Sequence, residues 1–319
     1  MLHCQTERRI NKLTNNNNNM ICDVETGVCG VPGSGEMELI DLTAPKKTIE
    51  LYYVTDPICS HCWAIEPQFN RFLEQYGNYF NVRTVMGGLL EKWGNGFADV
   101  QNGIAGPSDV AGHWREVGDM TRMPIDGSLW YDNPVTSSFP PSRVFKIVQK
   151  HNEKLARVFL RRAREAVFAF NRNISYEGVL IDLVNGLGLD GNAIAKEAEQ
   201  PVGQQLLNED FQLAASLGAR GFPTIIMVNE ENKGVKIVGG RPFEYYVAGL
   251  KQVLGEDPES KQQPALADYL AKEKLLFSKE IEVMYDLEQA AIKDYVEKEL
   301  SANDYEVKEV LGETYFVKN

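Results

Sequence analysis

The alternation of apolar and polar residues predicts a strand, a helix and a second strand between residues 48 and 86. The run TIELYYVT at 48–55 is rich in β-branched and aromatic residues, and an Asp-Pro turn follows it. Apolar residues then recur at helical spacing from residue 65 to residue 76, before Gly77 ends the segment. The run FNVRTVM at 80–86 supplies the second strand. We therefore expect a β-α-β unit.

Helical patterns dominate the middle of the chain, from about residue 95 to residue 218. The clearest helices are predicted at residues 140–152 and 153–170. In the second of them, five apolar residues share one helical face: Leu155, Phe159, Ala163, Ala166 and Phe170. Three arginines lie off this face and are therefore predicted to be solvated: Arg161, Arg162 and Arg164.

Strand patterns return after residue 218. The run TIIMVN at 224–229 and the run VKIVGG at 235–240 are predicted to form a hairpin, and Pro242 opens another helix. The complete order is β-α-β, a helical block, then β-β-α. This order predicts an α/β chain with a thioredoxin fold, interrupted by a helical insertion between its two halves.

A polar linker at residues 255–264 precedes a further unit. Three short helices and a hairpin around Gly312 give it a winged-helix-like order. Acidic residues outnumber basic ones there, which argues against DNA binding, so we interpret the unit as a protein-docking or dimerising module. The predicted organisation is a flexible arm at 1–45, a thioredoxin-fold domain at 46–254 with its insertion at about 95–218, and the C-terminal module at 264–319.

The charge and composition of the chain argue against some classes of function. The formal net charge of −12 disfavours a general binder of nucleic acid or of anionic membranes, and no stretch has the length of a membrane span. The N-terminal region lacks the apolar core of a secretion signal, so a cytoplasmic location is expected. It contains an asparagine run that cannot build a core, and both Met1 and Met20 are candidate starts.

The candidate chemistry is the run Cys59-Ser60-His61-Cys62 at the predicted strand-to-helix junction. A thiolate is the attacking species in disulfide exchange, and a helix N-terminus stabilises an anion there. Cys59 is the predicted nucleophile, His61 would stabilise its thiolate, and Cys62 would resolve a mixed disulfide. A zinc site, a structural disulfide and a chance pairing remain alternatives. The position at a strand-to-helix junction favours a redox dithiol. A zinc ribbon is disfavoured because it needs a second Cys-x-x-Cys pair.

Two prolines support the same interpretation. Pro67 falls five residues after Cys62 and is expected to bend the helix that carries the motif. Phe222-Pro223-Thr224 directly precedes the third predicted strand, where a thioredoxin fold places a cis-proline loop facing the dithiol. We predict a cis bond at Pro223, which would shape the peptide-binding edge. The alternative is a proline that merely starts a strand.

The runs DPICSHCWAIEP and GARGFPTIIMV, with the helical insertion between them, resemble the DsbA-like thiol oxidoreductases, in particular the FrnE-type branch. The resemblance covers about residues 48–254, and Ser60 stands where DsbA has a proline. It implies a thiol–disulfide oxidoreductase or isomerase that acts on protein thiols and disulfides and needs no organic cofactor. The implied catalytic residues are Cys59, Cys62, His61 and Pro223. The implied substrate-contacting residues are Phe222, Thr224, Ser60 and Trp63.

The run LLFSKEIEVMYDL in the C-terminal module resembles the tail of the adaptor family that presents the regulator Spx to the ClpXP protease. This second resemblance implies a largely non-catalytic protein that binds a regulator. The module would then contact the protease or a second copy of the chain. We rank the enzyme above the adaptor, because the chain keeps the Gly-Phe-Pro-Thr loop. A glutathione-dependent transferase is disfavoured, since such sites use a single serine or cysteine.

The remaining candidates carry weaker patterns. Cys22 and Cys29 could close a small hairpin as an auxiliary dithiol, or could be free thiols. Zinc binding by these two with His3 and Cys4 is disfavoured by their spacing, so no metal site is predicted. Asp56 and Glu66 flank the motif, where either could relay protons, but they are interpreted as a turn residue and a surface helix residue. His113 and His151 are expected in or near ordinary surfaces. Gly87 and Gly88 are candidates to line a substrate groove.

Overall fold

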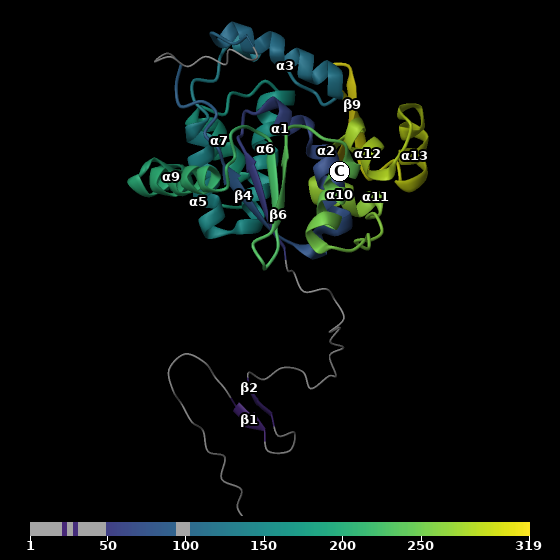
Figure 1. The fold of residues 1–319 in the computed structure, drawn as a ribbon. Coiled ribbons are helices and arrows are strands. Elements are labelled where there is room, and N and C mark those ends of the chain that lie inside the picture. Colours follow the sequence, from purple (N-terminus) through teal and green to yellow (C-terminus); the bar gives the residue numbers. More distant parts are fainter. Residues whose placement is uncertain (1–20, 24–27, 31–48, 94–102) are drawn as a thin grey trace, which may run out of the picture. The chain divides into compact units, whose positions relative to one another are not determined.

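The structure is a computed structural model that describes residues 21–23, 28–30, 49–93 and 103–319. The chain divides into two compact units, Met1–Ala44 and Pro45–Asn319. In the first unit, β1 (Ile21–Asp23) and β2 (Val28–Gly30) form an antiparallel pair, labelled in Figure 1. A hairpin at Cys22 and Cys29 is one of the two alternatives that the sequence left open for this segment.

A four-stranded sheet in the order β4-β3-β5-β6 forms the centre of the second unit. Its strands are β3 (Ile49–Thr55), β4 (Phe80–Met86), β5 (Thr224–Val228) and β6 (Gly234–Val238). β3 pairs in parallel with β4 and antiparallel with β5, which in turn pairs antiparallel with β6. The predicted thioredoxin topology is therefore confirmed.

One face of this sheet is covered by α2 (Glu66–Tyr76) and α10 (Phe243–Leu254), which pack on each other (Figure 1). Their apolar faces supply aromatic rings, with the Phe72 and Tyr246 centroids 5.7 Å apart. α2 follows α1 (Ser60–Ala64) after a single residue, and Pro67 lies in the first turn of α2. A proline is accommodated in a first helical turn because its missing N–H has no partner there. The break in this segment thus lies just before the predicted position.

Among the described residues, the helical insertion supplies most of the largest hydrophobic core cluster. Its helices are α3 (Pro107–Thr121), α4 (Leu129–Asp132), α5 (Phe139–His151), α6 (Glu153–Arg164), α7 (Glu177–Asn185), α8 (Gly191–Glu199) and α9 (Pro201–Ser216). The predicted helix at 153–170 ends as α6 at Arg164 and continues as a π-helical turn, Glu165–Ala169. This turn brings Phe168 into the core.

The prediction that the arginines of α6 are solvated is wrong. The exposed fraction is 6% for Arg161 and 1% for Arg164, and Arg162 is partly buried. An apolar stripe on one face does not require the opposite face to meet water, since other elements can cover it. Here the covering elements bring glutamates, so the arginines are buried with compensating charge.

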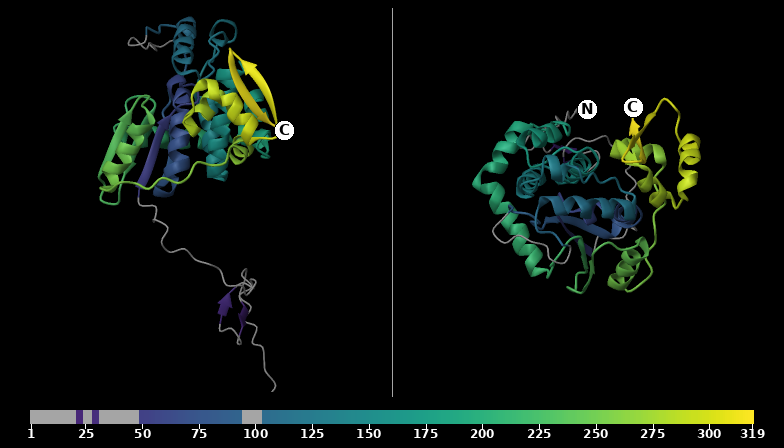
Figure 2. Two further views of the ribbon diagram at one scale, coloured as in Figure 1. Left: turned by 90° about the vertical axis from the view of Figure 1, so that its right-hand side faces the viewer. Right: turned by 90° about the horizontal axis from the view of Figure 1, so that it is seen from above.

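The C-terminal residues form a second, three-stranded sheet in the order β7-β9-β8 with helices beside it (Figure 2). Its elements are α11 (Leu266–Glu273), β7 (Leu275–Phe277), α12 (Ser278–Tyr285), a 3₁₀ turn (Gln289–Ala291), α13 (Ile292–Glu299), β8 (Tyr305–Val310) and β9 (Glu313–Lys318). The three predicted helices and the hairpin are present, together with β7, which the sequence pattern missed. These residues have their own apolar cluster and also pack on α2 through α12. No helix among the described residues could cross a membrane.

Candidate redox site

The two cysteines of the dithiol lie where β3 leads into α1. Cys59 is the N-cap residue of α1, and its Sγ accepts a hydrogen bond from the backbone N–H of Cys62 at 3.1 Å. A cap residue normally uses a side-chain oxygen to satisfy these free N–H groups, and here sulfur takes that place. The same N–H groups would stabilise a thiolate on Cys59.

The structure contains the Cys59–Cys62 disulfide, with Cα atoms 5.2 Å apart. Cys59 is 5% exposed, whereas Cys62 is fully buried. An attacking sulfur from another molecule would therefore meet Cys59 first. The burial of Cys62 suits the resolving role expected for it.

The loop before β5 reaches the same edge of the sheet. The Phe222–Pro223 peptide bond is cis, which confirms the prediction for this position. Thr224 pairs with Val54 in the sheet, so Pro223 lies level with the end of β3, where the segment to the dithiol begins. The Thr224 hydroxyl donates to the carbonyl of Gly221 at 2.8 Å and so braces the loop.

Gly87 supports this loop from β4. A Cβ atom at Gly87 would overlap the ring of Phe222, which is partly exposed. The glycine therefore allows the Phe222 ring to pack directly on the backbone after β4. That Gly87 and Gly88 line a substrate groove stays a prediction.

Trp63 does not face a substrate surface, contrary to expectation. Its side chain is fully buried, and its indole N–H donates to the carbonyl of Pro124 at 3.0 Å. The ring stacks on Phe168 and meets Phe277 of β7 edge to face, with centroids 5.8 and 5.7 Å away. The residue after the dithiol thus anchors α1 to both the insertion and the C-terminal residues.

Two histidines meet beside the dithiol. The rings of His61 and His113 are 5.2 Å apart between centroids, and Nε2 of His113 lies 3.5 Å from Oγ of Ser60. Partial burial, and secondarily the charge of His113, lower the pKa of His61. His113 is half-buried, and its contact with the motif was not anticipated from the sequence. His151 lies on the surface, as expected, and pairs with Glu197 at 2.9 Å.

Asp56, expected to be a plain turn residue, is fully buried. Its carboxylate accepts hydrogen bonds from the backbone N–H of Ile58 at 3.0 Å and of Leu89 at 2.8 Å, and from the Ser138 hydroxyl at 2.8 Å. It thereby ties the turn before the dithiol to the strand-end of β4 and to the start of α5. Burial outweighs these donors and raises the pKa of Asp56 to about 6.

The raised pKa of Asp56 predicts a stability change with pH. The folded protein binds this proton more tightly than the unfolded chain, in which the pKa of the aspartate is 3.8. The protonated carboxyl therefore stabilises the folded state at low pH, and this stabilisation is lost as the pH rises through about 6. The loss amounts to at most about 3 kcal/mol. We expect Asp56→Asn to flatten the dependence of unfolding free energy on pH between about 4 and 6.5, measured by urea denaturation. The exposed Asp182→Asn is the control, and equal slopes in Asp56→Asn and the parent protein would contradict the prediction.

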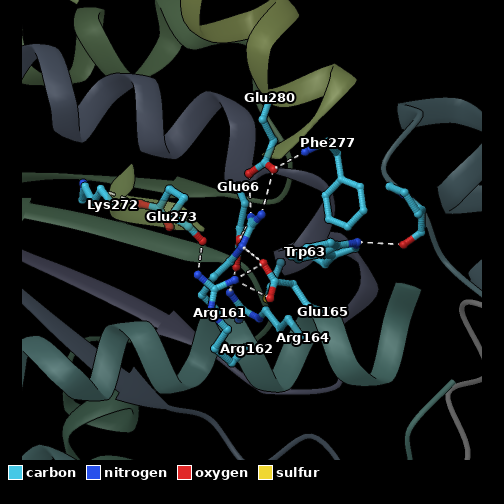
Figure 3. Close-up of polar contacts among 12 residues, drawn as sticks. Trp63, Glu66, Arg161, Arg162, Arg164, Glu165, Lys272, Glu273, Phe277 and Glu280 are labelled. Atoms are coloured by element: carbon cyan, nitrogen blue, oxygen red, sulfur yellow. Dashed lines mark hydrogen bonds and ion pairs between the residues drawn. The ribbon is translucent and has the colours of Figure 1, made fainter. Parts of the chain in front are cut away.

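A buried cluster of charges lies beside Trp63 of α1 (Figure 3). The guanidinium of Arg161 contacts Glu66 of α2 and Glu165 of the π turn at 2.8 Å each, and Glu280 of α12 at 2.5 Å. Arg164 contacts the other oxygen of Glu66 at 2.7 Å. The expectation that Glu66 is a surface helix residue is therefore wrong. No local pattern reveals this cluster, because its members come from three distant segments.

The cluster joins the dithiol segment to the C-terminal residues. Glu280 also accepts a hydrogen bond from the backbone N–H of Phe277 at 2.9 Å, so it orients the start of α12. The Arg161 guanidinium lies 4.9 Å from the centre of the Trp63 ring, a cation–π distance. Figure 3 shows Trp63 and Phe277 beside the ion pairs. One side chain, Arg161, therefore contacts α1, α2, the π turn and α12.

Two further cysteines belong to the first compact unit. Cys22 and Cys29 are direct partners in the β1–β2 register. An auxiliary role for this pair stays a prediction, and the candidates His3 and Cys4 lie outside the described residues. Within residues 49–93 and 103–319 and the two short strands, no group of three or more ligating side chains could hold a metal ion.

Comparison with known proteins gives two kinds of match. A family model described as Thioredoxin matches residues 52–248. The ClpXP adapter protein SpxH of Halalkalibacterium halodurans is 30% identical over 86% of this chain and 90% of its own length. The ClpXP adapter protein SpxH of Bacillus subtilis is 28% identical over 80% of this chain and 83% of its own.

Among solved structures, the cytosolic disulfide reductase DsbM of Pseudomonas aeruginosa has a TM-score of 0.52 at 22% identity. The match covers 65% of this chain and 98% of DsbM. At this identity the likeness establishes the DsbA-like fold alone. The SpxH relatives match a larger share of this chain than this structure does, so their similarity extends beyond the thioredoxin-like part.

Proposed function

Because this chain belongs to the thioredoxin family, and to the same family as the SpxH adapter proteins, we propose that its Cys59–Cys62 pair exchanges disulfide bonds with protein substrates. One observation carries the proposal: Cys59 caps α1 with its sulfur, at the sheet edge that also carries the cis Pro223 loop. A purely structural disulfide needs neither the helix N-terminus nor that loop.

The proposed exchange proceeds in two steps. The Cys59 thiolate attacks one sulfur of a substrate disulfide, an S–S bond forms between them, and the second substrate sulfur leaves as a thiolate. Cys62, once deprotonated, attacks the Cys59 sulfur, and the first substrate sulfur leaves as well. Two electrons pass from the dithiol to the substrate, and the two thiol protons end on the departing thiolates. The reverse sequence oxidises a substrate dithiol.

The surrounding residues have supporting roles in this proposal. The backbone N–H of Cys62 stabilises the Cys59 thiolate, and His61 adds to that stabilisation when it carries a proton. Phe222 and Pro223 form the edge that receives the substrate chain. Ser60 and Thr224, both buried, act by bracing the motif and the loop.

A second candidate function is that of a ClpXP adapter, in which the chain holds a regulator such as Spx for the protease. The observation that favours it is the extent of the match to the SpxH proteins, which goes beyond residues 52–248. In this view the dithiol and its loop serve as a binding surface. The two functions are compatible, since an exchange site also binds protein chains.

A double substitution, Cys59→Ser with Cys62→Ser, separates the two functions. We expect it to abolish the reduction of insulin disulfides while Spx degradation by ClpXP still rises on addition of the variant. A Cys22→Ser, Cys29→Ser protein serves as the matched control and keeps both activities. If the parent protein shows no exchange and still stimulates degradation, the exchange proposal fails and the adapter stands. If neither protein stimulates degradation, the adapter proposal fails.

A further inference from the structure

The insertion places a second histidine against the dithiol motif. α3 lies next to α1, as Figure 1 shows and their contacts establish. Trp114, the residue after His113, is buried, with its ring centroid 4.5 Å from Phe168 and 5.0 Å from Trp130. These contacts fix the rotation of α3 about its axis. The imidazole of His113 is thereby held at Ser60 and His61.

We propose that His113 is a positioning residue of the redox site, which limits the positive charge on His61 and so moderates the acidity of Cys59. The inference rests on the proposed exchange function and names the group that regulates it. Two imidazoles with centroids 5.2 Å apart repel each other when both are protonated. A proton on His113 therefore disfavours a proton on His61, and less positive charge remains beside the Cys59 thiolate.

On α3, Asp109 accepts hydrogen bonds from the backbone N–H groups of Ala105 and Gly106, and Glu116 is exposed. Three further ionisable groups near α1 have partners of their own. Glu66 of α2 forms ion pairs with the arginines of α6. Asp56, in the turn between β3 and α1, accepts three hydrogen bonds. Arg161 of α6 lies over Trp63 with its charge met by glutamates. α1 itself carries one other ionisable group, Cys62, and Cys59 is its N-cap. Burial and His113 are the causes that lower the pKa of His61, in agreement with this arrangement.

The consequence for the dithiol follows from the charge on His61. A cation beside Cys59 stabilises its thiolate and hence the reduced form of the pair, which makes the disulfide a stronger oxidant. By keeping His61 more often neutral, His113 makes the disulfide a weaker oxidant than His61 alone would. The insertion would thus contribute directly to the redox poise of the thioredoxin-like part.

Two substitutions at His113 with opposite expected signs test the proposal. His113→Gln removes the charge and can still hydrogen-bond Ser60, so the pKa of His61 rises above the parent value, which NMR of the imidazole in the disulfide form measures. His113→Lys keeps a permanent positive charge, so the pKa of His61 falls below the parent value. In the reduced proteins, the pH profile of Cys59 alkylation shifts to lower pH for the glutamine variant.

His151→Gln, a change at the surface histidine paired with Glu197, is the matched control and leaves both profiles unchanged. A His61 titration that is the same in the parent and in both His113 variants would overturn the proposal. Shifts of the His61 pKa in the same direction in both variants would also overturn it. Such shifts would show that the effect does not depend on the charge of residue 113. The titration needs no turnover. Its outcome therefore stands apart from a failure of the exchange function itself.

Discussion

Replacing Cys59 with serine is expected to lower the rate of disulfide exchange by about 10³-fold or more, because a serine hydroxyl cannot act as the nucleophile that a thiolate provides. Cys59 is the more exposed sulfur of the pair and the one that accepts the Cys62 N–H. Exchange is measured as the release of thiol from a fluorescent glutathione disulfide. Background exchange by the remaining cysteines sets the lower limit of the assay.

Replacing Cys62 instead gives a different signature. Cys62→Ser leaves the attack by Cys59 intact and removes the resolving thiol, so a mixed disulfide with the substrate accumulates and is detected by intact mass. Cys29→Ser, in the first compact unit, is the control and behaves as the parent protein does. If Cys59→Ser kept parental exchange, or if Cys62→Ser trapped no substrate, the assignment of the two roles would be wrong.

Replacing Arg161 with alanine is expected to reduce the free energy of unfolding by about 3–5 kcal/mol, the range typical when one partner of a buried ion pair is removed. Arg161 is buried against three glutamates, and Glu280 is fully buried with it. Glu66 and Glu165 keep other arginines after the change, whereas Glu280 loses its cation partner among the described contacts. Urea denaturation measures the loss.

The matched control is Lys233→Ala, which removes an ion pair with Glu231 on the surface. Exposed pairs contribute little to stability, so this variant should unfold close to the parent protein. Limited proteolysis gives a second readout, since cleavage at the linker before α11 should rise only in Arg161→Ala. Equal stability of Arg161→Ala and Lys233→Ala would contradict the role of the buried charges in holding the C-terminal residues.

The parts of the structure that local patterns determine were predictable from sequence. Strand alternation and helical spacing gave the β-α-β unit, the insertion and the closing β-β-α unit. The position of the dithiol and of the cis Pro223 loop followed from that order. β7 was missed, because a three-residue apolar run inside a helical pattern carries no strand signal of its own.

The surroundings of the dithiol were not predictable, since they depend on tertiary contacts. Glu66, Arg161 and Glu280 resemble surface residues when each helix is considered alone. Only the packing of α2, α6 and α12 brings their charges together away from water. His113 similarly reaches the motif from a helix more than 50 residues away in the sequence. Trp63 was assigned to the substrate surface because its burial by Phe168 and Phe277 has no local signature.

These contacts also connect the two candidate functions. The dithiol segment carries Trp63 and Glu66, and both meet residues that contact or belong to the C-terminal unit. The thioredoxin-like residues and the C-terminal residues belong to one compact unit, so a partner bound to either of them contacts the same packed structure. We expect substitutions at Arg161 to weaken adapter function as well as stability, whereas substitutions at Cys59 should affect exchange alone.

The reduction potential of the Cys59–Cys62 pair tests the central claim most directly. The protein is equilibrated with defined ratios of reduced and oxidised glutathione, and the thiols are alkylated and counted by mass, with Cys22 and Cys29 replaced by serine. An exchange site should have a potential between about −270 and about −120 mV, so that both forms are populated across the glutathione range. A pair that stays oxidised in buffers below about −300 mV would be a structural disulfide and would contradict the account.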